Sequence, residues 1–256
     1  MIIERNIPLF RKIRFTHEPI PKKVLEQGND IAIITYDNLD LPRFRSVERY
    51  TPIVELTKPL EDLILACNDT TRNEIRKAEK NPDIRIDICA YGDQRFIEAY
   101  EVFRNHESAQ GRKPYPIESF SGYWFIVASY LDEVISCVSF LALSDLLRIR
   151  SISSKRLQTD DKEKKKIVSN SSRYVIWKLI EFGHEAGYSK LDMAYVSGGA
   201  SEKLGIDAFK MGFGGEVVSD YTFSYRSPWI KLALQLVVAA RNWRTQAKSE
   251  VVASDK

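Results

Sequence analysis

Apolar and polar side chains alternate most regularly in the segment Ile84–Ala90, where every second residue is hydrophobic. A period of two predicts a strand with one buried face. Before this segment the period lengthens, and apolar residues recur at helical spacing from Leu60 onward. That spacing predicts two helices, the second ending near Pro82. After the strand, the pattern predicts a further helix, with Asp93 as its N-terminal cap.

The middle of the chain predicts three consecutive strands, over residues 123–130, 134–143 and 147–152. The first two are joined by a short turn and form an antiparallel hairpin. A polar, lysine-rich stretch over residues 153–169 is predicted to be an exposed loop. The next helix is predicted to begin at the capping cluster Asn170-Ser171-Ser172 and to end at Gly187.

The last part of the chain predicts a strand over residues 191–196, a short helix over 206–211 and an alternating strand over 217–225. Near the N-terminus only residues 31–34 and 52–56 predict strands. We therefore interpret residues 1–227 as one domain, with residues 1–51 as an N-terminal extension. Residues 228–256 predict an amphipathic C-terminal helix and tail. This order predicts an α/β fold of the α+β type, built on a mixed sheet with an antiparallel run in its middle, and excludes a plain doubly wound sheet.

Composition excludes several classes of protein. The apolar fraction of 44% and the charged fraction of 29% are typical of globular chains, and a net charge of +3 does not by itself indicate nucleic-acid binding. The first fifteen residues lack the apolar core of a secretory signal, and no apolar run is long enough to cross a membrane. A cytoplasmic protein is expected.

The residues that commonly form metal sites or nucleophilic centres are scattered. Three cysteines lie far apart in the sequence, which favours neither a disulfide framework nor a zinc site. Three histidines have no partner at a useful spacing. We therefore predict no metal site and no covalent catalysis. The cysteines are Cys67, Cys89 and Cys137, and the histidines are His17, His106 and His184.

Two segments near the C-terminus resemble the signature of FemAB-like proteins, a branch of the GNAT superfamily. They are Gly187-Tyr-Ser-Lys-Leu-Asp-Met-Ala-Tyr195 and Gly205-Ile-Asp-Ala-Phe-Lys-Met-Gly-Phe-Gly-Gly-Glu216. The basic helix expected over residues 71–80 is similar to one that precedes the first core strand in that family. The resemblance implies a GNAT-like acyltransferase fold and transfer of an acyl group to an amine. Some members take amino acids from aminoacyl-tRNA to peptidoglycan precursors, whereas other relatives use acyl-CoA.

The chain departs from this family in three respects, one of which is that Asp192 is followed by Met-Ala-Tyr-Val before Gly198-Gly199, where the family often has Gly-Gly directly. FemAB enzymes of peptidoglycan synthesis usually carry two tandem GNAT-like domains, and this chain has room for about one. The glycine-rich pyrophosphate loop of ordinary acyl-CoA enzymes is absent between Ser153 and Arg173. The identity of the donor is therefore the part of the function that the resemblance constrains least.

The resemblance implies a catalytic role for Lys210, within the pair Phe209-Lys210. A cation at the developing oxyanion stabilises the tetrahedral intermediate of acyl transfer, and the alternative is a surface lysine. Asp192 is a candidate to receive the proton of the amine or to orient the acceptor, or else a structural anchor. Tyr195 is a candidate acceptor contact, or else a core residue. The glycines at positions 212, 214 and 215 are expected to form a tight turn.

Donor binding is predicted around the helix that we expect to begin at Asn170. In a GNAT fold this region faces the phosphates of the donor, and a helix N-terminus favours an anion. A solvated run of charge is the alternative for the lysines, and a solvated helix face is the alternative for Arg76. The candidate donor-binding residues are Asn170, Ser171, Arg173, Lys165 and Lys166, and Arg76 is a candidate phosphate contact of the substrate.

The sequence thus predicts an N-acyltransferase that uses acyl-CoA, most simply acetyl-CoA. The expected acceptor is a small-molecule or lipid-linked amine, such as an amino sugar or cell-envelope precursor, which would place the enzyme in polysaccharide biosynthesis. One alternative is a FemAB-type ligase with aminoacyl-tRNA as its donor, and another is a non-catalytic GNAT-fold binding module. The helix between Trp229 and Trp243 suits peripheral contact with the inner face of the membrane, or packing against the domain or a second subunit. The oligomeric state stays open.

Overall fold

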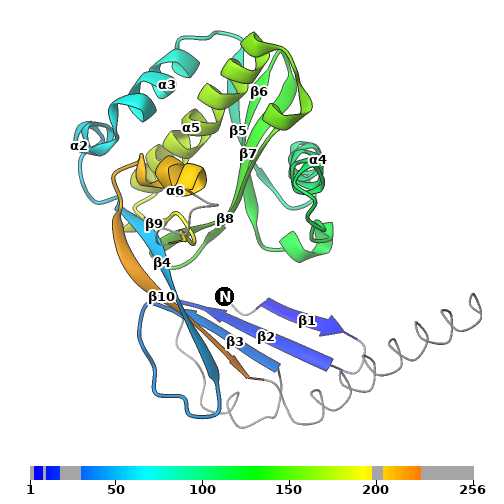
Figure 1. Ribbon diagram of the computed structural model, residues 1–256, viewed down its shortest axis with the longest axis vertical. Helices are drawn as coiled ribbons and strands as arrows, with labels where there is room; N and C mark the ends of the chain where they lie inside the picture. Colours follow the sequence, from blue (N-terminus) through cyan, green and yellow to red (C-terminus); the bar gives the residue numbers. More distant parts are fainter. Residues whose placement is uncertain (1–2, 8–9, 18–29, 198–203, 226–256) are drawn as a thin grey trace, which may run out of the picture. The chain divides into compact units, whose positions relative to one another are not determined.

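The computed structural model describes residues 3–7, 10–17, 30–197 and 204–225. The chain divides into two compact units (Figure 1). One unit comprises Met1–Glu48 together with Asp220–Lys256, and the other comprises Arg49–Ser219. The C-terminal helix that the sequence predicts over residues 228–256 lies outside the described residues.

The larger unit is built on a sheet whose strands follow the order β4-β9-β8-β7-β6-β5. Neighbouring strands in this order are antiparallel except β8 and β9, which are parallel. The strands are β4 (Arg45–Glu55, from Arg49 onward in this unit), β5 (Ile84–Ala90), β6 (Trp124–Tyr130), β7 (Glu133–Ala142), β8 (Leu146–Ser154), β9 (Lys190–Asp192) and the first residues of β10 (Glu216–Tyr225).

Helices cover both faces of this sheet (Figure 1). The long helix α5 packs on one face, with α3 beside it, and their apolar residues form one core with Val138 and Leu147 of the sheet. On the other face α4 and a 3₁₀ turn pack Phe96, Phe120 and Phe125 edge to face or stacked. The helices are α2 (Leu60–Ala66), α3 (Asp69–Glu79), α4 (Gln94–Ala109), η1 (Ile117–Phe120), η2 (Lys155–Gln158), α5 (Lys162–Glu185) and α6 (Leu204–Met211).

Most of the predicted elements of this unit are confirmed. The alternating segment Ile84–Ala90 is β5 with the predicted ends. The hairpin forms between β6 and β7, and its turn residues Leu131 and Asp132 both have positive φ, as the tight turn of a two-residue hairpin requires. The mixed sheet with an antiparallel run in its middle is the predicted fold class.

Three local predictions are wrong. The lysine-rich residues from Lys162 onward are helical, so the helix that we expected at Asn170 begins eight residues earlier. The strand predicted over residues 191–196 ends at Asp192, because Ala194 takes a left-handed conformation with φ of 60°. Asp93 does not cap α4 with its side chain. Its carboxylate accepts a hydrogen bond from the N–H of Ala90 instead.

The smaller unit contains the strands β1 (Ile3–Ile7), β2 (Phe10–Thr16) and β3 (Asp30–Thr35), together with β10 from Asp220 onward. Their order is β1-β2-β3-β10, with β2 and β3 parallel and the other pairs antiparallel. Ile31, Ile33 and Phe223 form its buried apolar cluster. The sequence predicted β3 and β10 but not β1 and β2. No helix within the described ranges combines the length and the apolar character needed to cross a bilayer.

Candidate functional site

The parallel strands β8 and β9 are paired over a short distance only. Leu146, Leu147 and Arg148 lie opposite Lys190, Leu191 and Asp192. β9 then ends, whereas β8 continues to Ser154. In the part of the chain that the structure describes, no strand pairs with this edge of β8 beyond Arg148. The two strands therefore separate at a point marked by a pair of opposite charges.

Asp192 is the acidic member of that pair, and its side chain is completely buried. Its carboxylate accepts hydrogen bonds from the guanidinium of Arg148, the hydroxyl of Thr51 and the N–H of Ala194, the last at 2.7 Å. A buried carboxylate is tolerated when charged and hydrogen-bonding partners replace its water. These contacts are those expected of a structural anchor, the alternative that the sequence left open, and a proton-accepting role stays a prediction.

Lys210 approaches the same turn from α6. Only 8% of this residue is exposed, and its ammonium group donates to the carbonyls of Ala194 at 3.2 Å and Tyr195 at 2.8 Å. The carboxylate of Asp192 binds the N–H of Ala194, and the ammonium of Lys210 binds the carbonyl of the same residue. The two charges thus hold one left-handed turn from two sides, and the surface-lysine alternative for Lys210 is wrong.

Tyr195 follows the held turn and presents its side chain to solvent. It is 38% exposed, and the guanidinium of Arg49 lies 5.5 Å from the centre of its ring. A cation at this distance from an aromatic face is attracted to it. The core alternative for Tyr195 is therefore wrong, and contact with an acceptor stays a prediction. The side chain that follows the turn is therefore exposed, whereas the two charges that bind the turn, Asp192 and Lys210, are buried.

The glycines of the signature are required by close packing. Gly214 has φ of +77°, and a side chain there would lie 2.4 Å from the carbonyl oxygen of Ala66. A side chain on Gly215 would meet the backbone of Ile53 at 3.0 Å. The tight turn that the sequence predicted is present, and it joins α6 to the end of α2 and to β4. This part of the signature has a packing role.

Three of the predicted donor-binding residues, Asn170, Ser171 and Arg173, lie in the interior of α5 and not at its N-terminus. Ser171 is fully buried, and its hydroxyl has no hydrogen-bond partner in the described chain. Arg173 donates to Glu74 at 2.8 Å and to Thr71 at 2.7 Å, and lies over the ring of Phe209 at 4.7 Å. Arg173 therefore connects α5 with α3 and α6. Because Asn170 is nine residues past the N-cap, the backbone N–H groups expected to bind a phosphate there are used within the helix.

The true beginning of α5 is capped by an acidic side chain. The carboxylate of Asp161 accepts hydrogen bonds from the N–H groups of Glu163 at 2.7 Å and Lys164 at 3.0 Å. Lys165 lies 3.6 Å from Asp160, and Lys166 is exposed. Arg76, on α3, is also exposed. A negative charge already occupies the place where a phosphate would bind most favourably.

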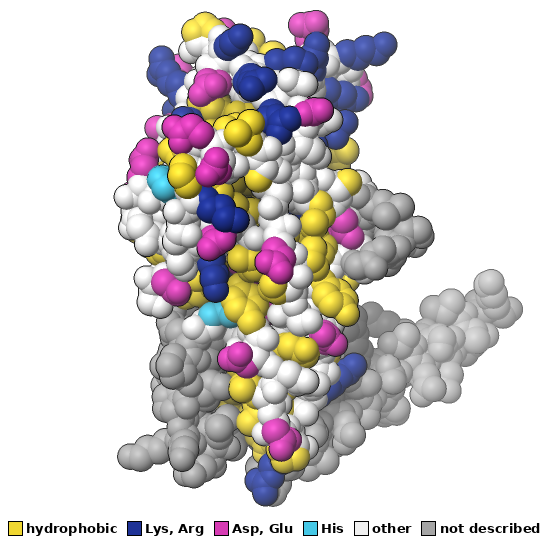
Figure 2. Space-filling model, turned by 90° about the vertical axis from the view of Figure 1, so that its left-hand side faces the viewer, with side chains coloured by type: hydrophobic (Ala, Val, Ile, Leu, Met, Phe, Trp, Pro, Cys, Tyr) yellow, Lys and Arg dark blue, Asp and Glu magenta, His cyan; other side chains and the backbone are white. Residues whose placement is uncertain are grey.

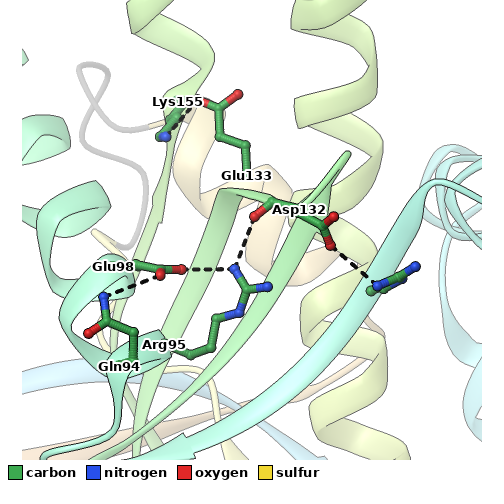
Figure 3. A network of polar contacts seen from close by, with 7 residues as sticks. Gln94, Arg95, Glu98, Asp132, Glu133 and Lys155 are labelled. Carbon is green, nitrogen blue, oxygen red and sulfur yellow. Dashed lines mark hydrogen bonds and ion pairs between the residues drawn. The ribbon is translucent and has the colours of Figure 1, made fainter.

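The lysines near this end of α5 belong to a balanced network of charges. Glu133, in the β6–β7 hairpin, binds Lys155 at 2.8 Å and Lys164 at 3.1 Å. Figure 3 shows the neighbouring part of the network, in which Arg95 donates to Glu98 and to the carbonyl of Asp132. In the face drawn in Figure 2, basic side chains gather at one end with acidic ones among them. This end of the unit is therefore not a uniformly positive surface.

Sequence reasoning missed Arg150, which occupies a β-bulge in β8. Ser139 and Phe140 of β7 lie opposite Ser151 and Ile149, so Arg150 has no partner across the ladder. Its guanidinium lies 4.1 Å from the ring centre of Phe120, with the rings of Tyr123 and Tyr115 also nearby, and donates to Ser119. Bulges commonly redirect a side chain beside functional sites. Two arginines that alternate with Leu147 and Ile149 in the predicted strand, Arg148 and Arg150, were the available signal.

The cysteine thiols do not offer a nucleophile. Burial raises the pKa of Cys67 to about 11 and that of Cys89 to about 12, and also raises the pKa of the fully buried Cys137. A thiol must ionise and be accessible in order to attack a carbonyl. Within the described residues, no group of three or more His, Cys, Asp or Glu side chains is arranged to hold a metal ion.

Comparison with solved structures shows which fold this architecture has. The chain is similar to FemX, with a TM-score of 0.64 and 10% identity over 91% of this chain and 85% of that one. It is also similar to the C-terminal domain (DUF2156) of a putative lysylphosphatidylglycerol synthetase from Agrobacterium fabrum, with a TM-score of 0.58 and 12% identity over 91% of this chain and 83% of that one.

A third similar structure is L-PGS from Bacillus licheniformis, with a TM-score of 0.53 and 12% identity over 89% of this chain and 81% of that one. No protein-family model matches the sequence, and no curated protein matches it. At these identities the comparisons show the fold alone. The chain has the FemAB-like GNAT fold that its C-terminal signature predicted.

Proposed function

We propose that the protein is an acyltransferase that moves an acyl or aminoacyl group from an activated donor directly to an amine. The observation that carries this proposal is the separation of β8 from β9 after Arg148 and Asp192. An extended ligand can add along a strand edge by hydrogen bonds to the main chain. A donor on the edge of β8 would bring its reactive carbonyl toward the charged turn at the end of β9.

The proposed reaction transfers the acyl group directly from the donor to the amine, without a covalent enzyme intermediate. The amine nitrogen attacks the carbonyl carbon of the donor and forms a tetrahedral oxyanion. The bond from that carbon to the leaving sulfur or oxygen then breaks, while the nitrogen loses a proton and the leaving group gains one. An acyl-enzyme on cysteine is not part of the proposal, because burial raises the pKa of all three thiols.

Each residue of the turn has a role in this proposal. The charge of Lys210 stabilises the oxyanion, an interaction that typically contributes about 3–4 kcal/mol when one donor is involved. Phe209 packs against Phe213 at 5.8 Å between ring centres and orients α6 for this purpose. Tyr195 contacts the acceptor, and Asp192 orients the turn through Ala194. The proposed acceptor is an amino sugar or another amine of a cell-envelope precursor, handled in the cytoplasm.

The two donors of the sequence prediction differ in what they require at α5. Acyl-CoA carries a diphosphate, and the sequence predicts that this group binds at a helix N-terminus at Asn170. The actual N-terminus is occupied by the carboxylate of Asp161, and this favours an aminoacyl ester of tRNA, which needs no diphosphate there. The name of one similar structure, a putative lysylphosphatidylglycerol synthetase, agrees with aminoacyl transfer. Acyl-CoA remains the second candidate, since its amide-containing arm suits the edge of β8.

Labelled-donor assays separate these candidates. The purified protein is given [¹⁴C]acetyl-CoA or [¹⁴C]aminoacyl-tRNA together with a panel of amino sugars, and the label in the acceptor is counted. Aminoacyl transfer that disappears after RNase treatment supports the first donor. Acetyl transfer that resists RNase supports the second. Absence of transfer from either donor rejects the enzymatic proposal in favour of a binding module.

Substitution of Lys210 tests the catalytic residue. Lys210→Met removes the charge and keeps most of the stem, so we expect turnover to fall roughly 10²–10³-fold. Lys210→Arg retains a cation and should lose less. Lys178→Met is the matched control, because Lys178 is a partly buried lysine paired with Glu181 on α5. Turnover of Lys210→Met within about threefold of the unmodified protein contradicts the assignment.

A further inference from the structure

The outer strand of the larger sheet, β5, has an unpaired edge. Within the described chain β5 pairs with β6 alone, in an antiparallel ladder from Ile84 to Ala90. The apolar side chains of Ile88 and Trp124 are 38% and 42% exposed near this edge. Natural proteins usually cover such an edge, interrupt it or use it for pairing with another chain.

The two faces of β5 differ sharply in chemistry. Its isoleucines, Ile84, Ile86 and Ile88, alternate along the strand and share one face, and the first two pack partly against the main core. The other face carries Arg85 and Asp87, both exposed. Arg85 lies 3.3 Å from Asp132 of its own chain, a pair that is 74% and 73% exposed. One strand therefore presents an apolar row and two opposite charges two residues apart.

We propose that two copies of this chain pair through β5, antiparallel, about a two-fold axis that passes through Ile86. In this register Ile86 lies opposite Ile86 of the partner subunit. Arg85 then lies opposite Asp87 of the partner subunit, and the reverse pair forms on the other side of the axis. A symmetric dimer repeats every contact twice. The isoleucine rows of the two copies become continuous on one face of the extended sheet.

Other registers lose one or both of these features. If the two-fold axis passes through Arg85, this residue lies opposite Arg85 of the partner subunit. If the axis passes through Asp87, that residue lies opposite Asp87 of the partner subunit. Like charges directly opposite one another destabilise a strand pair. A shift by one position sets isoleucines opposite charged side chains, because the side-chain period of a strand is two. The self-complementary charge pattern thus selects one register and one partner, a second copy.

The contact is expected to be weak, because a ladder of this length buries less than the roughly 1,600 Å² of a standard interface. We expect a dissociation constant on the order of 10–100 µM. The inference is independent of the proposed acyl transfer, since it uses no residue of the β9 turn.

Sedimentation velocity with charge-reversed chains tests the pairing. The unmodified protein should sediment as a concentration-dependent dimer between about 1 and about 500 µM. Arg85→Asp and Asp87→Arg should each weaken it roughly tenfold or more, because both reversed pairs repel. An equimolar mixture of the two variants, or the double swap in one chain, should restore it. Asp132→Asn, the control for the pair within one chain, should have no effect.

Two outcomes of this experiment overturn the proposal. One is a monomer over the whole concentration range, which leaves the edge to solvent or to another protein. The other is a dimer that neither reversal weakens, which places the interface elsewhere.

Cysteine cross-linking tests the register. Paired Cα atoms in an antiparallel ladder are about 4.5 or 5.5 Å apart, within the range of a disulfide. Ile86→Cys should therefore form a covalent dimer under mild oxidation. In Ile84→Cys the two introduced residues would lie about 14 Å apart, since four residues separate them along the strand. The native thiols are buried and give little background.

The cross-linking result is decisive in either direction. Covalent dimer with Ile86→Cys and not with Ile84→Cys supports the register. Equal yields from both variants, or none from either when both retain the circular dichroism spectrum and melting temperature of the unmodified protein, reject it.

Discussion

The end of β9 and the beginning of α5 both carry charge, but they use it differently. At β9 two charged side chains, Asp192 and Lys210, are buried and bind the backbone of one turn. At α5 several lysines are exposed or paired with acidic neighbours such as Glu133. Exposed pairs of this kind contribute little because water and salt screen them. The two buried charges therefore fix the conformation of a backbone turn. The exposed lysines fix no comparable backbone conformation.

The difference also changes which residues deserve attention for function. The lysine run is the more obvious feature of the sequence, and it suggested a phosphate site. In the structure its helix begins with the carboxylate of Asp161, which already satisfies two N–H groups. The turn held by Asp192 and Lys210 has instead a fixed conformation beside the place where two strands separate. We therefore place the candidate site at the turn whose conformation is fixed by two buried charges, and not at the exposed lysine run.

The largest effect should come from Asp192→Ala. The substitution removes the acceptor for three donors and leaves the guanidinium of Arg148, which is 13% exposed, without this carboxylate. Breaking one partner of a buried ion pair typically costs about 3–5 kcal/mol. We expect a loss of that size in the free energy of unfolding, measured by urea denaturation. A loss below about 1 kcal/mol would mean that the buried pair at the end of β9 contributes no more to stability than an exposed pair at the start of α5.

The second largest effect should come from Gly214→Ala, which tests the packing of the signature motif. A left-handed conformation costs an L-residue about 1–2 kcal/mol, and overpacking against the carbonyl of Ala66 adds about 1–3 kcal/mol. Gly187→Ala is the matched control, because Gly187 has φ of +79° but open space around it. Equal losses in the two variants would show that conformation alone matters and that the close approach to α2 does not.

A smaller effect is expected from Asp161→Ala at the cap of α5. Loss of an N-cap side chain typically costs about 1 kcal/mol. Thermal denaturation should show a modest decrease in melting temperature. Asp160→Ala, the neighbouring control, changes an exposed side chain 3.6 Å from Lys165 and should leave the melting temperature unchanged. If the acyl-CoA proposal is correct in spite of the cap, Asp161→Ala should also strengthen coenzyme A binding.

The smallest effect on stability should come from the protonation of His106. The imidazole of this residue is hydrogen-bonded to the carbonyl of Ser154, the last residue of β8. Burial lowers the pKa of this imidazole below its ordinary value of 6.5. The unfolded chain then takes up the proton first as pH falls. The contribution of His106 to the free energy of unfolding should therefore be constant above pH 6.5. It should decrease as the pH falls from 6.5 to the lowered pKa of the folded state. Urea denaturation between pH 7.5 and 5.5 measures this slope, and His106→Gln should reduce it. An unchanged slope would assign the decline to other groups.

Much of the fold could be predicted because local patterns determined it. β5 has the predicted ends because its isoleucines alternate without interruption and a turn follows at once. The strands β1 and β2 were missed because segments such as Arg11-Lys12 and Arg14 interrupt the apolar pattern with charge. The start of α5 was missed because the run after Asp161 has no apolar stripe. Its signal was different in kind, an N-cap aspartate followed by residues that favour helices.

The candidate site could be predicted only in part, because its contacts are long-range. The signature correctly drew attention to Asp192 and Lys210, which the structure brings to one turn. Their partners Arg148 and Thr51 are 44 and 141 residues away from Asp192 in the sequence, and no local pattern joins them. The misplaced helix start moved the expected donor site from a capped terminus to the interior of α5. An error of eight residues in one boundary thus changed the interpretation of Asn170, Ser171 and Arg173.

The bulge at Arg150 has a consequence for comparing this chain with others of its fold. Leu147 and Ile149 point to the α5 side of the sheet, and after the extra residue Ile152 points there as well. A relative without the extra residue, if aligned to this chain without a gap, would be matched one position out of step beyond Arg150, so that inward side chains are paired with outward ones. A sequence alignment therefore needs a one-residue gap at Arg150. With that gap, side chains that point to the same face of the sheet are matched.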